Sequence, residues 1–292
     1  MKLPRVFLFA ALALSSFTVL AAAESKYPPH TIARSELRVL EPTEHGRHYQ
    51  LSIGLPPSHA ENPDRKYPVV IVTDGYWDFV KMTTAHGGLV YDRVAPEFIV
   101  VGLGYAGEDL NPGQMRQWEL SPVARENNPD SGHAAEFLQT IKNVIIPFVE
   151  KEYRADPEYR VMAGASLGGL FTLYSMYAEP GLFDAYIAAT PAVVVGNDWL
   201  LEFEEKFAAT GAPLPVRLFV SGGGNESPGF LGGMLRFNSR VANRDYGSDF
   251  AYKFRIIDGE RHAGMQIESY TRGLRFAFEP LAPETGPVAP PR

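Results

Sequence analysis

A serine in a glycine-rich turn is the first pattern in this sequence that could do chemistry. Ser166 stands in the segment Gly164-Ala-Ser-Leu-Gly-Gly169, between the apolar run Tyr159–Ala163 and the helix-forming run Leu167–Ala178. In a nucleophile elbow, a serine occupies a sharp turn between a strand and a helix, and its hydroxyl is exposed at the end of the sheet. Backbone crowding at such a turn favours the flanking glycines. The pattern predicts a nucleophile at Ser166, and the alternative is a structural turn with an unreactive serine.

A seryl hydroxyl needs a base, and the sequence offers one in the right order. Only one of the seven histidines, His262, follows Ser166. Serine hydrolases built on a parallel sheet carry their residues in the order serine, acid, histidine. His262 also lies in the segment Asp258–Gly264, between the last expected strand and the last expected helix. We therefore predict that His262 is the general base and that the N–H of Leu167, at the helix start, is the first oxyanion donor.

The base in turn needs a carboxylate that orients it. Glu226 follows the expected strand Val216–Ser221 through a flexible glycine-rich turn, so it leaves the strand that precedes the histidine's own strand. We predict that Glu226 is this acid. Four other loop carboxylates compete for the role: Asp245, Asp249, Asp258 and Glu260. The first two lie nearer the start of the final strand, and the last two are too close to His262 to reach its far nitrogen easily.

Alternating strands and helices must position these residues. Glu36–Leu40 and His48–Leu55 flank a turn at Gly46 and predict an antiparallel pair at a sheet edge. Buried strands are expected at Pro68–Thr73, Phe98–Leu103, Tyr159–Ala163, Ala185–Ala189, Val216–Ser221 and Ala251–Ile257. Helices are expected at Ala134–Tyr153, where Pro147 would kink or end the helix, and at Leu167–Ala178, Asp198–Ala208, Phe230–Asn243 and Gly264–Phe278. This order predicts a mainly parallel central sheet flanked by helices.

The N-terminal residues have the pattern of an export signal. Lys2 and Arg5 precede the apolar run Val6–Leu20, which is shorter than the roughly 20 residues of a membrane-spanning helix. Small residues at 21–23 then offer a cleavage site, so we expect a signal peptide at 1–23 and a periplasmic or secreted protein without stable membrane insertion. Residues 24–280 would form one catalytic domain, and the proline-rich residues 281–292 a disordered tail.

Composition excludes several other classes of protein. Cleavage after residue 23 would remove two of the 27 basic residues and none of the 34 acidic ones, so the formal net charge would change from −7 to −9. This acidic balance, without a basic run, argues against a nucleic-acid partner. The chain has no cysteine, which excludes thiol catalysis and cysteine-based metal sites.

Several segments together resemble one known family. They are Lys66-Tyr-Pro-Val-Val-Ile-Val-Thr-Asp-Gly75, Ile99-Val-Val-Gly-Leu-Gly-Tyr105, Arg116-Gln-Trp-Glu-Leu-Ser-Pro122, Ile145-Ile-Pro-Phe-Val-Glu-Lys-Glu-Tyr-Arg154 and the elbow. From about Tyr49 to Phe278 the chain resembles the esterases of the α/β-hydrolase superfamily that include esterase D and the esterases of enterobactin-like and bacillibactin-like trilactone siderophores. The resemblance implies an α/β-hydrolase fold and a second oxyanion donor in the loop after Asp74, at Gly75 or Tyr76. It implies no metal and no organic cofactor.

The same resemblance suggests residues that contact substrate. Arg116 would lie near the pocket mouth and hold a carbonyl or anionic group, or else form a structural ion pair with a loop carboxylate. Trp77, Tyr76 and Trp118 would line an aromatic wall, or else serve only as core or lid residues. The chain departs from the family at Glu119-Leu-Ser121, where the family has Asp-aromatic-Thr. Its acidic balance also differs from what a site for an anionic iron–catecholate would favour.

These observations predict an exported serine esterase that acts on a small-molecule ester through an acyl-enzyme, with a siderophore trilactone as one candidate substrate. The residues also allow a feruloyl- or acetyl-type carbohydrate esterase, a thioesterase or an acyltransferase. A catalytically silent hydrolase fold that serves as a binding protein is the non-enzymatic alternative. The sequence does not specify the oligomeric state.

Overall fold

A computed structural model describes residues 30–43, 46–107, 110–126 and 128–283. The elements below belong to one unit that begins at Ala33. The expected signal peptide and residues 284–292 of the expected tail lie outside the described residues, while Leu281 ends a short 3-10 turn, Glu279–Leu281. None of the helices in the described ranges is both long and apolar enough to cross a membrane.

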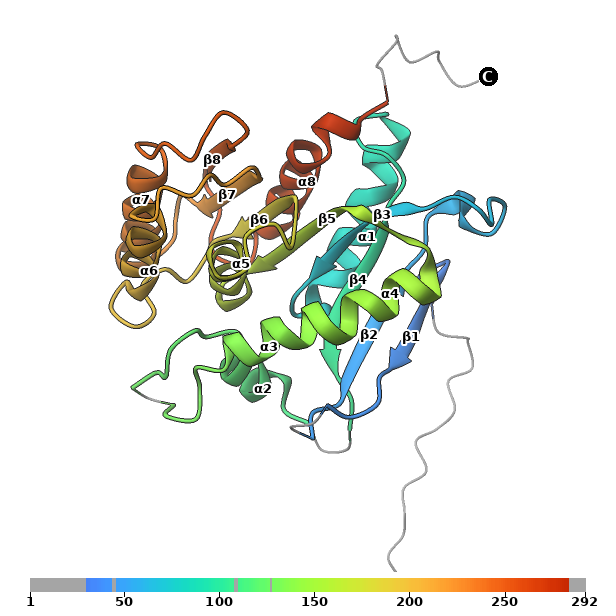
Figure 1. Cartoon of the computed structure of the whole chain (residues 1–292), viewed down its shortest axis with the longest axis horizontal. Helices are drawn as coiled ribbons and strands as arrows, with labels where there is room; N and C mark the ends of the chain where they lie inside the picture. Colours follow the sequence, from blue (N-terminus) through green and yellow to red (C-terminus); the bar gives the residue numbers. More distant parts are fainter. Residues whose placement is uncertain (1–29, 44–45, 108–109, 127, 284–292) are drawn as a thin grey trace, which may run out of the picture. The chain divides into compact units, whose positions relative to one another are not determined.

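An eight-stranded sheet forms the centre of this unit, in the order β1-β2-β4-β3-β5-β6-β7-β8 (Figure 1). The strands are β1 (Ser35–Val39), β2 (Tyr49–Gly54), β3 (Tyr67–Val72), β4 (Ile99–Tyr105), β5 (Ala155–Ala165), β6 (Ala185–Ala189), β7 (Arg217–Gly223) and β8 (Ala251–Ile257). β1 pairs with β2, and β2 with β4, in antiparallel register, and the remaining pairs are parallel. The predicted mainly parallel sheet with antiparallel N-terminal strands at its edge is confirmed.

Helices cover both faces of the sheet (Figure 1). They are α1 (Gly75–Tyr91), α2 (Pro112–Glu119), α3 (Ala134–Thr140), α4 (Ile146–Tyr153), α5 (Leu167–Ala178), α6 (Trp199–Ala208), α7 (Pro228–Val241) and α8 (Gln266–Ala277), with a 3-10 turn at Pro57–His59. α1 and α8 pack against each other and on the sheet, α1 over β4 and α8 over β6 and β7. α5 packs over β5 and β6, with α6 and α2 against it.

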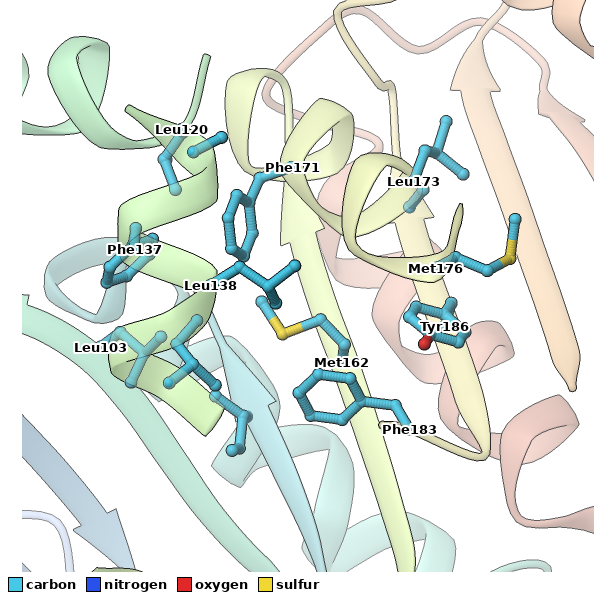
Figure 2. Close-up of a cluster of buried hydrophobic side chains, with 14 of the residues drawn as sticks. Leu103, Leu120, Phe137, Leu138, Met162, Phe171, Leu173, Met176, Phe183 and Tyr186 are labelled. Carbon is cyan, nitrogen blue, oxygen red and sulfur yellow. The ribbon is translucent and has the colours of Figure 1, made fainter. Parts of the chain in front are cut away.

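The buried core between the sheet and α3 and α5 is rich in aromatic and long aliphatic side chains (Figure 2). The ring centroids of Phe137 of α3 and Phe171 of α5 lie 5.1 Å apart, and Met162 of β5 and Phe183 belong to the same cluster. Burying one such aromatic side chain contributes roughly 1.5–3 kcal/mol. This packing fixes α5, and with it the turn that α5 shares with β5.

Two helices and one irregular turn were not anticipated from the sequence. No helix was predicted at α1 or α2, although Phe79, Met82, His86 and Leu89 have helical spacing and are buried on one face of α1. The predicted single helix Ala134–Tyr153 is interrupted at Ile141–Ile145 by a π-helical segment, after which α4 begins with Pro147 in its first turn. The wider turn accommodates a proline that cannot donate an intrahelical hydrogen bond.

Candidate active site

Ser166 occupies the turn between β5 and α5. Its backbone has φ 59° and ψ −117°, and it is the residue immediately before the helix. A positive φ is costly for a residue other than glycine, on the order of 1–3 kcal/mol, and such strain gathers at functional sites. The Ser166 N–H donates to the carbonyl of Ala189 at the end of β6, 3.0 Å away, and the Ser166 carbonyl accepts from Ala192. The neighbouring strand therefore helps to hold the strained turn.

The flanking glycines are required by close packing. A Cβ atom at Gly164 would lie 2.4 Å from the carbonyl oxygen of Gly168, and a Cβ at Gly168 would lie 2.1 Å from Oγ1 of Thr73. Atoms cannot approach so closely without displacing the backbone or the buried Thr73. The glycines thus allow the first turn of α5 to pack directly on the carboxyl ends of β5 and β3.

His262 and Glu226 meet beside this turn. Nδ1 of His262 lies 3.1 Å from Oε1 and 3.2 Å from Oε2 of Glu226. The Glu226 side chain is only 4% exposed, whereas that of His262 is 41% exposed, so a buried carboxylate supports an accessible imidazole. No other carboxylate in the described ranges lies within ion-pair distance of His262, and the rival Asp245 instead accepts from the N–H of Gly247.

Thr190 completes the support of Glu226, and the sequence analysis missed it. Its hydroxyl donates to Oε1 of Glu226 and lies 3.5 Å from Nδ1 of His262. Thr190 has φ 42°, an uncommon value for a β-branched residue, and its N–H donates to the carbonyl of Ser221 on β7, 2.6 Å away. A polar residue directly after the apolar strand β6, beside the elbow, was the signal that could have identified it.

Phe230 is a second residue that sequence analysis missed. Its ring meets the imidazole of His262 edge to face, with centroids 4.9 Å apart. Because Phe230 lies in the first turn of α7, which follows Glu226, the helix that begins after the acid also packs on the base.

The hydroxyl of Ser166 makes no hydrogen bond in the described part of the chain. This is compatible with a catalytic role, because catalytic hydrogen bonds often tighten only when substrate is bound.

The first turn of α1 lies at the same edge of the sheet. Gly75 and Tyr76, expected in a loop, are instead the first two residues of this helix, whose N–H groups have no intrahelical acceptor by position. A Cβ at Gly75 would lie 2.6 Å from the carbonyl carbon of Gly102, so glycine lets α1 begin directly against β4. Leu167 occupies the equivalent first position of α5. Both helices direct their positive ends toward the edge that carries Ser166.

Arg116 is held by an ion pair at this turn. Its Nε and Nη2 donate to the two carboxylate oxygens of Asp74, at 2.7 and 2.9 Å, and both side chains are largely buried. Asp74 is the residue immediately before α1 and has φ 55°. Of the two roles considered for Arg116, the structure shows the ion pair with a loop carboxylate. Its position ties α2 to the start of α1.

The three aromatic candidates differ in their surroundings. The Trp118 ring stacks on His133, with ring centroids 3.7 Å apart. The guanidinium carbon of Arg47 lies 3.8 Å from the ring centroid of Trp118. Trp118 is therefore already covered by protein groups, as expected of a packing residue. Trp77 is 51% exposed and Tyr76 is 41% exposed, and both project from the first turn of α1. Only these two remain available to line a substrate wall.

Glu119, the departure from the family pattern, is completely buried. Its Oε1 accepts from the hydroxyl of Tyr49, 2.6 Å away. Burial raises the pKa of Glu119 to about 7, and the hydrogen bond from Tyr49 opposes that rise. Glu119 ends α2, which also carries Arg116, so its charge state bears on the packing of this helix.

A hollow of about 1090 Å³ borders the loop that leaves β6. Arg125, Val194, Val195 and Asn197 are among the residues that line it. The loop begins at Thr190, and the N–H of Ala192 donates to the carbonyl of Ser166.

The described residues contain no group of three or more histidine, aspartate or glutamate side chains arranged to hold a metal ion.

The family model described as "Putative esterase" matches residues 43–215. The chain belongs to this esterase family. The match covers the elbow and both helix starts, and the chain is a carboxylic ester hydrolase of the α/β-hydrolase type, as the sequence predicted.

The chain is also similar to individual proteins of this kind. The chain is 25% identical over 272 residues to the ferri-bacillibactin esterase BesA of Bacillus subtilis, covering 87% of this chain and 92% of that protein. It is 27% identical over 181 residues to a siderophore enterobactin esterase of Emericella nidulans, covering 56% of this chain and 60% of that protein. The crystal structure of the BES protein from Bacillus cereus superimposes with a TM-score of 0.78 at 26% identity, covering 87% of this chain and 98% of that one.

Proposed function

We propose that this esterase is an exported enzyme that hydrolyses the ester bonds of a siderophore with Ser166 as nucleophile, His262 as general base and Glu226 as the orienting acid. The contact between His262 Nδ1 and the buried carboxylate of Glu226 carries the proposal, because it leaves the other imidazole nitrogen free to face a nucleophile. The strained backbone of Ser166, between β5 and α5, supplies that nucleophile.

The proposed reaction runs in two acyl-transfer steps. Oγ of Ser166 attacks the ester carbonyl while His262 takes the hydroxyl proton of Ser166. Glu226 stabilises the imidazolium that forms. The N–H of Leu167 and that of Gly75 or Tyr76 donate to the tetrahedral oxyanion. His262 then protonates the leaving alcohol, and water attacks the acyl-enzyme by the same route to release the acid.

The siderophore part of the proposal rests on the relatives and on available surface. The relatives named for an activity are esterases of bacillibactin, enterobactin, salmochelin and triacetylfusarinine C compounds. The exposed rings of Trp77 and Tyr76 offer stacking surface for aromatic groups, and the hollow beside the β6 loop is lined by one cationic residue, Arg125, and one anionic residue, Glu126. Export, by a signal at 1–23, would place the enzyme where such compounds are encountered.

A substrate panel tests this proposal. The purified protein without residues 1–23 is assayed on iron-free and iron-loaded trilactone siderophores, p-nitrophenyl esters and feruloyl esters, beside Ser166→Ala and the exposed-serine control Ser248→Ala. We expect the highest kcat/KM on a trilactone, full activity in S248A and none in S166A. Equal or higher kcat/KM on feruloyl esters would contradict the siderophore assignment, and activity retained by S166A would contradict the mechanism.

A further inference from the structure

A group of cationic side chains lies on β8 and α8, where β8 forms the edge of the sheet. A pocket of about 340 Å³ is lined by Lys253 and Arg255 of β8 and by Arg272 and Arg275 of α8. Lys253 and Arg255 are two residues apart on β8, so their side chains lie on the same face of the sheet. They pair with Phe219 and Ser221 of β7 and project from the face on which α8 packs. None of these residues belongs to the candidate active site.

The fold explains why a pocket exists here. α8 packs on β6 and β7, and a Cβ at its Gly273 would lie 2.4 Å from Ile187, so the helix is held close to those strands. β8 is the last strand of the sheet, and its side chains on this face stand beside the helix. Phe219 and Phe276 line the apolar part of the pocket. The size matches small-molecule sites, which span about 300–1,000 Å³.

Most of the positive charge in the pocket is not neutralised by the protein. Arg272 pairs with Glu268 at 2.6 Å, and the one lining carboxylate, Glu279, pairs with Arg217. In the described part of the chain, Lys253, Arg255 and Arg275 have no carboxylate partner within ion-pair distance. Like charges gathered in this way repel one another, so a bound anion would relieve the repulsion. The group is cationic although the protein as a whole carries a net charge of −7. The arrangement favours an anionic ligand.

We propose that this pocket binds a small organic anion that carries two or three negative charges, either a polycarboxylate or a phosphomonoester. The planar guanidinium groups of Arg255 and Arg275 suit two-point contacts with carboxylate or phosphate oxygens. Lys253 adds a point charge, and its Nζ lies 5.7 Å from the ring centroid of Phe276. The same anionic chemistry is present in lipid headgroups, and the experiment distinguishes that source.

The test uses titration calorimetry at low salt with citrate, with inorganic phosphate, and with phosphatidylcholine vesicles with or without phosphatidylglycerol. The pocket variant is R255Q/R275Q. The charge-matched control is K66Q/K151Q, which removes two exposed cations far along the chain from the pocket. Thermal melting of each variant verifies folding, and R255K/R275K keeps the charge while losing the planar contacts.

We expect wild type and the control to bind citrate or phosphate, and the pocket variant to bind about tenfold or more weakly. R255K/R275K should give intermediate affinity. Binding of anionic vesicles without binding of soluble anions, again lost only in R255Q/R275Q, would support the site and assign it to headgroups. The proposal is overturned if wild type binds none of these probes, or if K66Q/K151Q weakens binding as much as R255Q/R275Q does.

Discussion

Replacing Glu226 by glutamine probes the proposed triad with minimal change of shape. Glutamine keeps a carbonyl oxygen that can accept the hydroxyl of Thr190, which now donates to Oε1 of the carboxylate. The substitution removes the negative charge that faces Nδ1 of His262 and replaces one of the two oxygens at 3.1 and 3.2 Å by an NH2 group that cannot accept. It therefore tests what the acid contributes to orienting His262 and to stabilising the imidazolium that forms during attack.

The expected magnitude follows from that distance and from burial. Two unit charges 3.1 Å apart interact by about 5 kcal/mol at an effective dielectric constant of about 20, and by about 1 kcal/mol in bulk water. The carboxylate is 4% exposed and the imidazole 41%, which places the pair in the upper part of this range, at about 3–5 kcal/mol. A loss of that size lowers kcat by about 10²- to 10⁴-fold.

The assay is steady-state hydrolysis of p-nitrophenyl acetate by wild type, E226Q and the control E260Q. Glu260 is the matched control because it is a carboxylate in the same loop as His262. We expect E260Q to behave as wild type and E226Q to lose kcat with little change in KM. A kcat for folded E226Q within about threefold of wild type would refute the role assigned to Glu226.

Four further predictions follow from the site and its supports. Thr190→Val should lower kcat about tenfold or more with KM unchanged, and Thr190→Ser should restore it, because a hydrogen bond to a charged group contributes about 1.5–3 kcal/mol. Arg116→Lys should lower kcat rather than raise KM in the same assay if its ion pair positions the start of α1, and the reverse split would indicate substrate contact. Gly164→Ala should destabilise the fold by about 1–3 kcal/mol in urea titrations, because its Cβ would meet backbone, whereas Gly88→Ala, in open space, should not. Folding raises the pKa of Glu119 from 4.5 to about 7, so the unfolded chain loses this proton first as the pH rises. The free energy of unfolding should therefore fall by about 3 kcal/mol between those two pH values. Thermal melts across this pH range should show the fall in the wild type, and Glu119→Gln should remove it.

Strands and the helix after the elbow could be predicted from the sequence because their signals are local. β6 and β8 and helix α5 have the predicted bounds, since apolar runs, turn residues and helical spacing mark them directly. α1 was missed because its apolar face includes His86 and because Gly87 and Gly88 are poor helix formers. Burial against β4 and α8 overrides that propensity.

The residues of the candidate site likewise fall into those with a local sequence signal and those that depend on tertiary contacts. Ser166 and His262 were proposed from order and flanking pattern, and the structure brings Glu226 to His262, although their catalytic roles stay predictions. The role of Thr190 depends on three strands meeting at one edge, which no local pattern specifies. The ion pair of Arg116 likewise depends on how α2 folds back, so the sequence left two readings open.

The central claim is that Ser166 is the nucleophile of this esterase. A fluorophosphonate probe followed by peptide mass spectrometry tests it most directly, because phosphonylation marks the activated seryl oxygen itself. We predict a single adduct on the peptide that contains Ser166, blocked in S166A and strongly slowed in a His262→Gln variant. An adduct on another serine, or no adduct in a protein that hydrolyses esters, would contradict the account.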